Sequence, residues 1–305
     1  MKVAIIGPGR VGMTLAYTLV LKGLVTELVL VGGNPAKARG EAMDLNHSLL
    51  FLRTPVKVSA GEIADVAGSE VIAICASVPM TADLQDRNQL AAANIELMRT
   101  LVPAAAAAAP QAIFLILSNP VDVLTWQALR LTGLPATRVI GSGTLIDSAR
   151  YRDALSMQVG IHPDDIRSYV LGEHGDTQFV AMSLAQSGAE PLDDTPARRK
   201  LFSESTAAGF QVFKLKGNTC YAVALAASVV IEAILLDEKR TMPLSIAING
   251  YCGVHNVCLS VPVVVGRGGI ERVLQPPLNE AEQAAFRRSA AAVRAVIDAT
   301  GVADG

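Results

Sequence analysis

The chain has little charge and no long apolar run, and each shortage excludes a class of protein. Charged residues make up 18% of the 305 residues, against roughly 25% in an ordinary soluble domain, and apolar residues make up 51%. This composition excludes a disordered chain and indicates that copies of the chain bury surface in a homo-oligomer. Apolar stretches such as residues 222–231 are shorter than the roughly 18 residues of a membrane span, so we expect no membrane segment.

Neither sign of charge dominates, and the cysteines are few. Lys and Arg number 26 against 28 Asp and Glu, a net charge of −2, which excludes a broad attraction to nucleic acid or to an anionic membrane. The four cysteines form no CxxC pair, and the first apolar run stops at Gly7, unlike a secretory signal. We therefore expect reduced thiols, a cytoplasmic protein and no metal site.

The two halves of the chain differ in pattern, and 305 residues suit about two domains. Short apolar runs that alternate with helical patterns are typical of buried parallel strands joined by helices. The first half has four such runs, at residues 3–6, 28–31, 71–76 and 113–117. After about Gly141 the stretches become longer and amphipathic, with isolated strands such as residues 261–265. We predict an α/β protein, with a doubly wound parallel sheet followed by a mixed α+β domain.

Two helices have recognisable ends. Six alanines, residues 104–109, lie between Pro103 and Pro110, which predicts a helix that begins at Pro103 and ends before Pro110. Near the end of the chain, Asn279 can cap a helix and Glu282 can complete a capping box three residues later. The sequence therefore predicts a closing helix after Asn279.

A glycine-rich turn follows the first predicted strand and opens a helix expected at residues 9–20. It reads Gly7-Pro8-Gly9-Arg10-Val11-Gly12. Glycines let the backbone approach phosphates, and the helix N-terminus offers unpaired N–H donors and a positive potential. The alternative is a glycine turn kept for packing. We favour a Rossmann-type dinucleotide-binding domain at residues 1–141, with residues 142–305 left for substrate binding and catalysis.

The acidic residue usual at the end of the second strand of such a domain is missing. Gly32 stands there, followed by Gly33 and Asn34. One interpretation is that Asn34 and backbone groups bind the ribose of NAD. Another is that the space admits the 2′-phosphate of NADP, neutralised by Lys37 or Arg39. These two cations are also compatible with a solvated helix face.

Four further segments place polar groups in apolar surroundings. They are Ser118-Asn119-Pro120-Val121-Asp122, Gly141-Ser142-Gly143-Thr144, Asp147-Ser148-Ala149-Arg150 and Gly172-Glu173-His174-Gly175-Asp176. In this order they resemble segments of the L-lactate and L-malate dehydrogenase family, and the resemblance covers nearly the whole chain. It implies an oxidoreductase that transfers a hydride between NAD and a small L-2-hydroxy acid.

The resemblance implies roles for three residues. His174 would accept the proton of the substrate hydroxyl, a task that suits imidazole because its pKa of about 6.5 lies near neutrality. Asp147 would hold the other ring nitrogen and stabilise the imidazolium. Arg150, three residues after Asp147 on one helical face, would bind the substrate carboxylate through a bidentate fork that lysine cannot form.

The resemblance also implies a loop, about residues 76–88, that closes over the substrate. On closure Arg87 would reach the reacting oxygen, in a site from which water is expelled. Asn94 would anchor this segment, Asn119 would donate to the same oxygen, and both would also contact the cofactor. Thr219 would line the pocket.

The choice of acid depends on the loop. The glutamate before His174 resembles the lactate branch, and six residues before Arg87 stands Thr81, where lactate enzymes have glutamine and malate enzymes arginine. Without an arginine there, a second substrate carboxylate would lie uncompensated in a dehydrated pocket. We expect L-lactate and pyruvate as substrates, a branched or larger 2-hydroxy acid as the alternative, and malate as a poor substrate.

Two other interpretations remain open. Residue 32 is not acidic, and the loop at residues 76–88 has Thr81 where the family has glutamine or arginine. The chain is therefore also compatible with a dinucleotide-binding protein that has no catalytic activity. Arg152 and Arg167 match positions where bacterial lactate enzymes bind a sugar bisphosphate between subunits, although exposed arginines are common. The homo-oligomer would be a dimer or a tetramer.

Overall fold

The computed structural model describes residues 1–78 and 87–301. The helices are α1 (Arg10–Leu21), α2 (Pro35–Ser48), α3 (Arg87–Ala108), α4 (Val121–Thr132), α5 (Leu145–Val159), α6 (Pro196–Lys216), α7 (Tyr221–Leu235) and α8 (Glu280–Ala299). The strands are β1 (Lys2–Ile6), β2 (Glu27–Val31), β3 (Lys57–Gly61), β4 (Val71–Ile74), β5 (Ile113–Ile116), β6 (Val139–Gly141), β7 (Ile166–Arg167), β8 (Val170–Leu171), β9 (Phe179–Val180), β10 (Gln186–Ser187), β11 (Glu190–Pro191), β12 (Arg240–Asn249), β13 (His255–Gly266) and β14 (Gly269–Val273).

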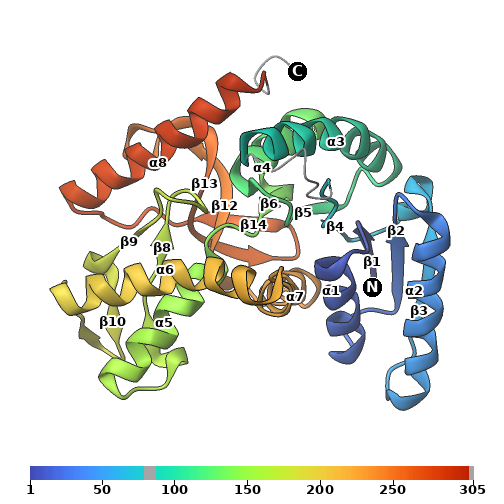
Figure 1. The fold of residues 1–305 in the computed structure, drawn as a ribbon, viewed down its shortest axis with the longest axis horizontal. Coiled ribbons are helices and arrows are strands. Elements are labelled where there is room, and N and C mark those ends of the chain that lie inside the picture. The colour runs from blue at the N-terminus through green and yellow to red at the C-terminus, as the bar shows by residue number, and fades with distance from the viewer. Residues whose placement is uncertain (79–86, 302–305) are drawn as a thin grey trace.

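One nine-stranded sheet runs through the molecule (Figure 1). Its order is β14-β13-β12-β6-β5-β4-β1-β2-β3, and the strands from β6 to β3 are parallel. The remaining three are antiparallel, and β12 joins β6 where Ser245 pairs with Gly141. The predicted fold class, a doubly wound parallel sheet followed by a mixed α+β part, is confirmed, and the two parts share one sheet.

The sequence pattern explains the layers. Strands β4 and β5 are buried along their whole length, as expected of parallel strands covered by helices on both faces. Helix α1 packs against α7 and buries Leu15 and Leu19 of the predicted apolar stripe, whereas Val11 is only partly buried next to the glycine turn. Among residues 1–78 and 87–301, no helix is both long and apolar enough to cross a bilayer.

Two predicted helix ends are confirmed and one is wrong. Helix α3 ends at Ala108, before Pro110, as expected. Asn279 and Glu282 form the predicted capping box at the start of α8. Pro103, in contrast, lies inside α3 and does not begin a helix. The preceding turns are already helical because Ile95 and Met98 are buried in the core, and this burial outweighs the one hydrogen bond that a proline removes.

Candidate active site

A cavity of about 890 Å³ lies at the carboxyl ends of β5 and β6. Five predicted site residues line it: Asn119, Asp147, Arg150, His174 and Thr219. They come from separate segments, after β5, on α5, after β8 and before α7. In open α/β sheets this edge is where ligands bind, because the connecting loops leave a crevice there.

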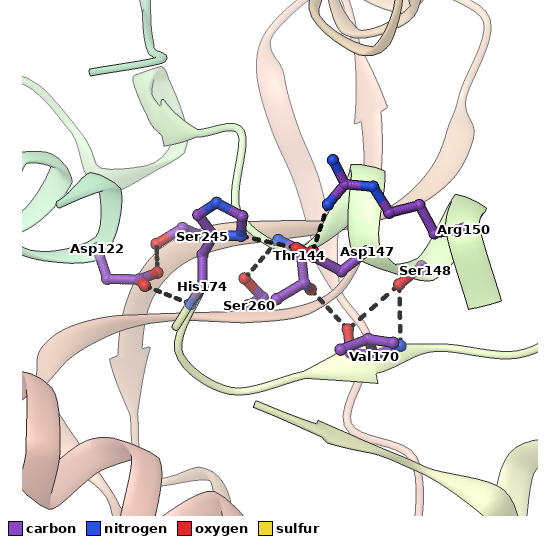
Figure 2. A network of polar contacts seen from close by, with 9 residues as sticks. All are labelled: Asp122, Thr144, Asp147, Ser148, Arg150, Val170, His174, Ser245 and Ser260. Carbon is purple, nitrogen blue, oxygen red and sulfur yellow. Dashed lines mark hydrogen bonds and ion pairs between the residues drawn. The ribbon is translucent and has the colours of Figure 1, made fainter. Parts of the chain in front are cut away.

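His174 and Asp147 meet in this cavity, although 27 residues separate them (Figure 2). The ring Nδ1 of His174 lies 2.6 Å from Oδ2 of Asp147, and the Asp147 side chain is 6% exposed. Burial tends to lower the pKa of His174, but the hydrogen bond and negative charge of Asp147 outweigh it, so the pKa is raised. Burial tends to raise the pKa of Asp147, but its bond to His174 lowers it. Both directions favour an imidazolium paired with a carboxylate.

Arg150 lies on the other side of the same carboxylate. Its Nη1 is 3.2 Å from Oδ1 of Asp147, one helical turn earlier on α5. The guanidinium also lies close to the backbone of α6, because a Cβ added to Gly209 would be 3.1 Å from Nη1. One aspartate therefore aligns an imidazole and a guanidinium at the cavity wall.

Buried hydroxyl groups connect the segment that carries Asp147 to the segment that carries His174 (Figure 2). The Thr144 hydroxyl donates to the Val170 carbonyl at 2.6 Å, and the Val170 N–H donates to Ser148 Oγ at 2.9 Å. The N–H of Thr144 donates to Ser260 Oγ at 3.0 Å. The start of α5 is thus bonded to β8 and β13, which limits how the pair can move apart.

Asp122 adds a contact that no sequence pattern predicted. Its Oδ2 accepts the backbone N–H of His174 at 2.7 Å, and its Oδ1 accepts the Ser245 hydroxyl at 2.6 Å. Asp122 is 3% exposed and lies in the first turn of α4. Its place in the polar Ser118–Asp122 segment was the available signal, but nothing in that segment indicates a partner 52 residues away.

The glycine turn has the geometry of a dinucleotide cradle. Gly7 has φ of +96°, and a Cβ there would lie 2.4 Å from the backbone nitrogen of Ala76. A Cβ at Gly12 would lie 2.3 Å from the Gly7 carbonyl oxygen. At Gly9, which precedes α1, no atom of the described residues lies within 4 Å of an added Cβ, so the backbone borders open space. A pyrophosphate fits such a turn, and Arg10 and Val11 begin the helix behind it.

Gly32 and Asn34 lie at the end of β2, as expected. The Asn34 Oδ1 accepts the N–H of Lys37 at 3.0 Å and so caps α2. A Cβ at Gly32 would lie 3.1 Å from Cγ of Pro8, so the glycine turn packs closely against this position. Asn34, Lys37 and Arg39 are exposed. The region that would face the adenosine ribose thus has an asparagine and two cations but no carboxylate within residues 32–39.

Asn94 is buried and its amide contacts two chain segments of the site. Its Oδ1 accepts the N–H of Val78 at 2.8 Å, and its Nδ2 donates to the Asn119 carbonyl at 2.8 Å. Thr81 lies outside the described residues, and of Arg87 only the backbone, at the start of α3, is described.

Arg152 and Arg167 lie in a second, smaller cavity of about 80 Å³, which Arg240 also lines. Arg152 donates to the Pro163 carbonyl at 2.6 Å and lies 3.5 Å from a carboxylate oxygen of Asp164. Burial lowers the pKa of Arg152, and the charge of Arg167 lowers it further. The structure therefore brings the predicted pair of arginines close together.

Three phenylalanines of α6 also line the main cavity, and no sequence pattern predicted them: Phe202, Phe210 and Phe213. Their helix carries no motif, and an apolar residue on an amphipathic helix is normally assigned to a protein core. Among the described residues, no group of three or more His, Cys, Asp or Glu side chains could hold a metal ion.

An imidazole–carboxylate pair, a nearby guanidinium and an adjoining cradle for a pyrophosphate define a dinucleotide-dependent oxidoreductase. Residues 1–141 match the family model described as lactate/malate dehydrogenase, NAD binding domain. Residues 144–302 match the lactate/malate dehydrogenase, alpha/beta C-terminal domain. The chain belongs to the lactate/malate dehydrogenase family, which confirms the resemblance seen in the sequence.

Relatives and solved structures agree with this family. An L-lactate dehydrogenase of Thermoanaerobacter sp. (strain X514) is 40% identical over 306 residues, covering 97% of this chain and 98% of that protein. An L-lactate dehydrogenase of Synechococcus sp. (strain JA-3-3Ab) is 38% identical over 98% of this chain and 99% of its own. The crystal structure of MGS-M5, a lactate dehydrogenase from a Medee basin deep-sea metagenome library, superimposes with a TM-score of 0.93 at 34% identity, covering 98% of each chain.

Proposed function

We propose that this enzyme interconverts L-lactate and pyruvate with NAD as the cofactor. The observation that carries the proposal is the group formed by His174, Asp147 and Arg150, in which one carboxylate aligns a proton carrier and a carboxylate-binding fork. The names of the similar proteins support lactate as the acid. This group of His174, Asp147 and Arg150 argues against a dinucleotide-binding protein without catalytic activity.

His174 carries the proton in this proposal. Because its Nδ1 faces Asp147, Nε2 is the ring nitrogen left for the substrate. In reduction, Nε2–H gives its proton to the carbonyl oxygen of pyruvate, which becomes the hydroxyl of lactate, and in oxidation Nε2 takes that proton back. Asp147 holds the ring and stabilises the imidazolium in both directions.

The other predicted residues orient the acid. Arg150 binds its carboxylate, Asn119 and Arg87 donate to its reacting oxygen, and Thr219 borders it. The role of Arg87 rests on the family resemblance. So does the role of Thr81, whose uncharged side chain cannot neutralise a second substrate carboxylate. Asn94 holds the Asn119 main chain in place through its amide.

We assign cofactor binding to residues 1–141 and substrate binding with catalysis to residues 142–305. Gly7, Gly9 and Gly12, with the first turn of α1 at Arg10 and Val11, would hold the pyrophosphate, and Asn34 would meet the ribose. When bound, the nicotinamide supplies or accepts the hydride. Since Gly32 brings no carboxylate, we expect NADPH to be used as well, with NADH preferred.

A second candidate substrate class is a branched or larger 2-oxo acid. The apolar walls formed by Phe202, Phe210 and Phe213 support it, because an aliphatic or aromatic substituent would bury its surface there. Oxaloacetate, with a second carboxylate, would meet those same apolar groups, because the cations among the described lining residues, Arg150 and His174, already serve the first carboxylate and the reacting oxygen.

A panel of 2-oxo acids tests these assignments. We expect pyruvate and branched 2-oxo acids to be reduced and oxaloacetate hardly at all, in steady-state assays run with NADH and with NADPH on the same plate. If Thr81 leaves a second carboxylate unbalanced, kcat/KM should be at least ~100-fold lower for oxaloacetate than for pyruvate. A preference for oxaloacetate would refute this role of Thr81, and no turnover with any acid would favour the inactive dinucleotide-binding protein.

We further propose that the enzyme is a cytoplasmic homo-oligomer with a sugar bisphosphate site at Arg152 and Arg167. Their closeness in one cavity supports an anion site, since two guanidinium groups together bind phosphate well. The unpaired state of the cysteines among the described residues supports a reducing compartment.

A further inference from the structure

We propose that Asp122 is a positioning residue for proton transfer, because its two carboxylate oxygens fasten the main chain of His174 to β12 and to the helix that follows Asn119. The inference rests on the proposed function in one respect: it takes His174 as the residue that transfers the proton. Asp122 is not among the residues that line the main cavity, and it acts through the main chain of His174.

The geometry uses both oxygens of the carboxylate. Oδ2 accepts the N–H of His174 at 2.7 Å, and Oδ1 accepts the hydroxyl of Ser245 at 2.6 Å. These are short contacts between donors and a buried acid, the kind that is strengthened when the acceptor is ionised. Figure 2 shows Asp122 to the left of His174, joined to its backbone nitrogen, while Asp147 contacts the ring from the right.

The position of Asp122 along the chain gives this contact its significance. Asp122 follows Asn119 by three residues, at the start of α4. Asn119 and His174 are two of the groups proposed to act on one substrate oxygen, and the buried Asp122 carboxylate joins their segments. Asn94 also holds this turn, because its Nδ2 donates to the Asn119 carbonyl. A small displacement between a donor and a proton carrier is costly, because both must reach one atom.

Asparagine at this position keeps both contacts only if its NH₂ group faces Ser245 and the Ser245 hydroxyl turns to accept, and it removes the negative charge in either case. A carboxylate accepts at both oxygens, whereas an amide has one accepting oxygen and one NH₂ donor. Asp122→Asn would therefore turn an NH₂ group toward either the His174 N–H or the Ser245 hydroxyl. The hydroxyl can rotate to accept, but the backbone N–H cannot.

The charge of Asp122 adds an electrostatic effect. Burial raises the pKa of Asp122 to about 6, while its bonds to Ser245 and to the His174 N–H oppose that rise. Its negative charge adds to that of Asp147 in raising the pKa of His174, and Arg150 acts in the opposite direction. Two further ionisable groups face Asp122: Glu173, which raises its pKa, and Cys258, whose own pKa lies well above the usual value.

The test compares two variants with a matched control. Asp122→Asn removes the charge, and Ser245→Ala removes one bond that keeps Asp122 ionised. Thr125→Val removes a buried hydroxyl of the same helix, one that donates to the Val121 carbonyl. The readouts are the titration of His174 by NMR without substrate, NADH binding by fluorescence, and the pH profile of pyruvate reduction.

We expect Asp122→Asn to lower kcat by roughly 10- to 100-fold with NADH binding unchanged, because a small misplacement of a catalytic group costs up to about 10²-fold in rate. The His174 titration and the alkaline limb of reduction should both move to lower pH. Ser245→Ala should move them in the same direction by less, and Thr125→Val should leave them in place.

An unchanged His174 titration in both variants would overturn the inference, as would equal losses of kcat in the control. If Asp122→Asn fails to fold, the Ser245→Ala titration decides alone. The NMR titration needs no substrate, so a wild-type enzyme that does not reduce pyruvate would refute the proposed function and leave the test of Asp122 intact.

Discussion

Among single residues, Asp147 contacts both of the charged groups proposed to act on the substrate. Its Oδ2 lies 2.6 Å from His174 Nδ1, and its Oδ1 lies 3.2 Å from Arg150. The pKa of Asp147 is lowered and the pKa of His174 is raised, and both shifts show that the charged pair is favoured. Because reduction of a 2-oxo acid consumes the proton of His174, that direction should persist above a pH of about 6.5 and decline as the pH passes the raised pKa. Oxidation of the hydroxy acid needs the neutral imidazole and should rise over the same range.

We predict that Asp147→Asn lowers kcat by a factor on the order of 10² to 10⁴, and much more than it weakens substrate affinity. The amide cannot stabilise the imidazolium, so the alkaline limb of reduction should also move to lower pH. Steady-state rates between about pH 5 and 9 measure both effects. Asp153→Asn, on the exposed side of α5, is the control and should keep the wild-type profile. A wild-type limb in Asp147→Asn would contradict the pairing.

At the scale of an element, α6 is the helix whose importance the sequence did not indicate. It contributes three phenylalanines to the cavity, and its backbone approaches Arg150 at Gly209, where a Cβ would lie 3.1 Å from the guanidinium. Glycine in a helix interior costs about 1 kcal/mol relative to alanine. The close approach explains why glycine is suitable there, since an added methyl would push the guanidinium away from its place beside Asp147.

Gly209→Ala should therefore change stability and substrate binding in opposite directions. We expect the free energy of unfolding to rise by about 0.5–1 kcal/mol and KM for pyruvate to rise several-fold, with a smaller change in kcat. Urea unfolding and steady-state kinetics measure the two effects. Gly40→Ala on α2, where an added Cβ has no described atom within 4 Å, should show only the gain in stability. Equal KM values for both variants would rule out the role of Gly209.

At the scale of the whole molecule, the composition and some exposed side chains bear on the proposed association of identical chains. Among the described residues, three large apolar side chains are almost fully exposed: Leu50 at 90% and Phe51 at 88%, which share one short helical turn, and Leu215 at 87%, near the end of α6. Together with the low charged fraction, this supports the expected association of identical chains.

We predict that the protein sediments with the mass of two or four 31.9 kDa chains. Fructose 1,6-bisphosphate should raise the rate or the degree of assembly, because its phosphates would neutralise the facing Arg152 and Arg167. Arg167→Ala should lose that response and keep the basal rate. Sedimentation equilibrium and assays with and without the bisphosphate provide the measurement. A monomer that does not respond would contradict both proposals.

The sequence alone determined the fold class, the glycine turn and the relative placement of Asp147 and Arg150. Apolar runs reveal strands buried on both faces, and a spacing of three residues puts two side chains on one helical face. The prediction from the sequence was wrong at Pro103. There the hydrogen bond that proline removes is outweighed by the burial of side chains on both sides of the turn.

Only the tertiary structure decided which distant groups meet. The bond from Asp122 to the main chain of His174, the place of Gly209 against Arg150 and the phenylalanine wall of α6 all join segments far apart along the chain. Periodicity and motifs report what a residue does within its own helix or strand. Contacts between elements depend on how their surfaces pack together, which no local pattern encodes.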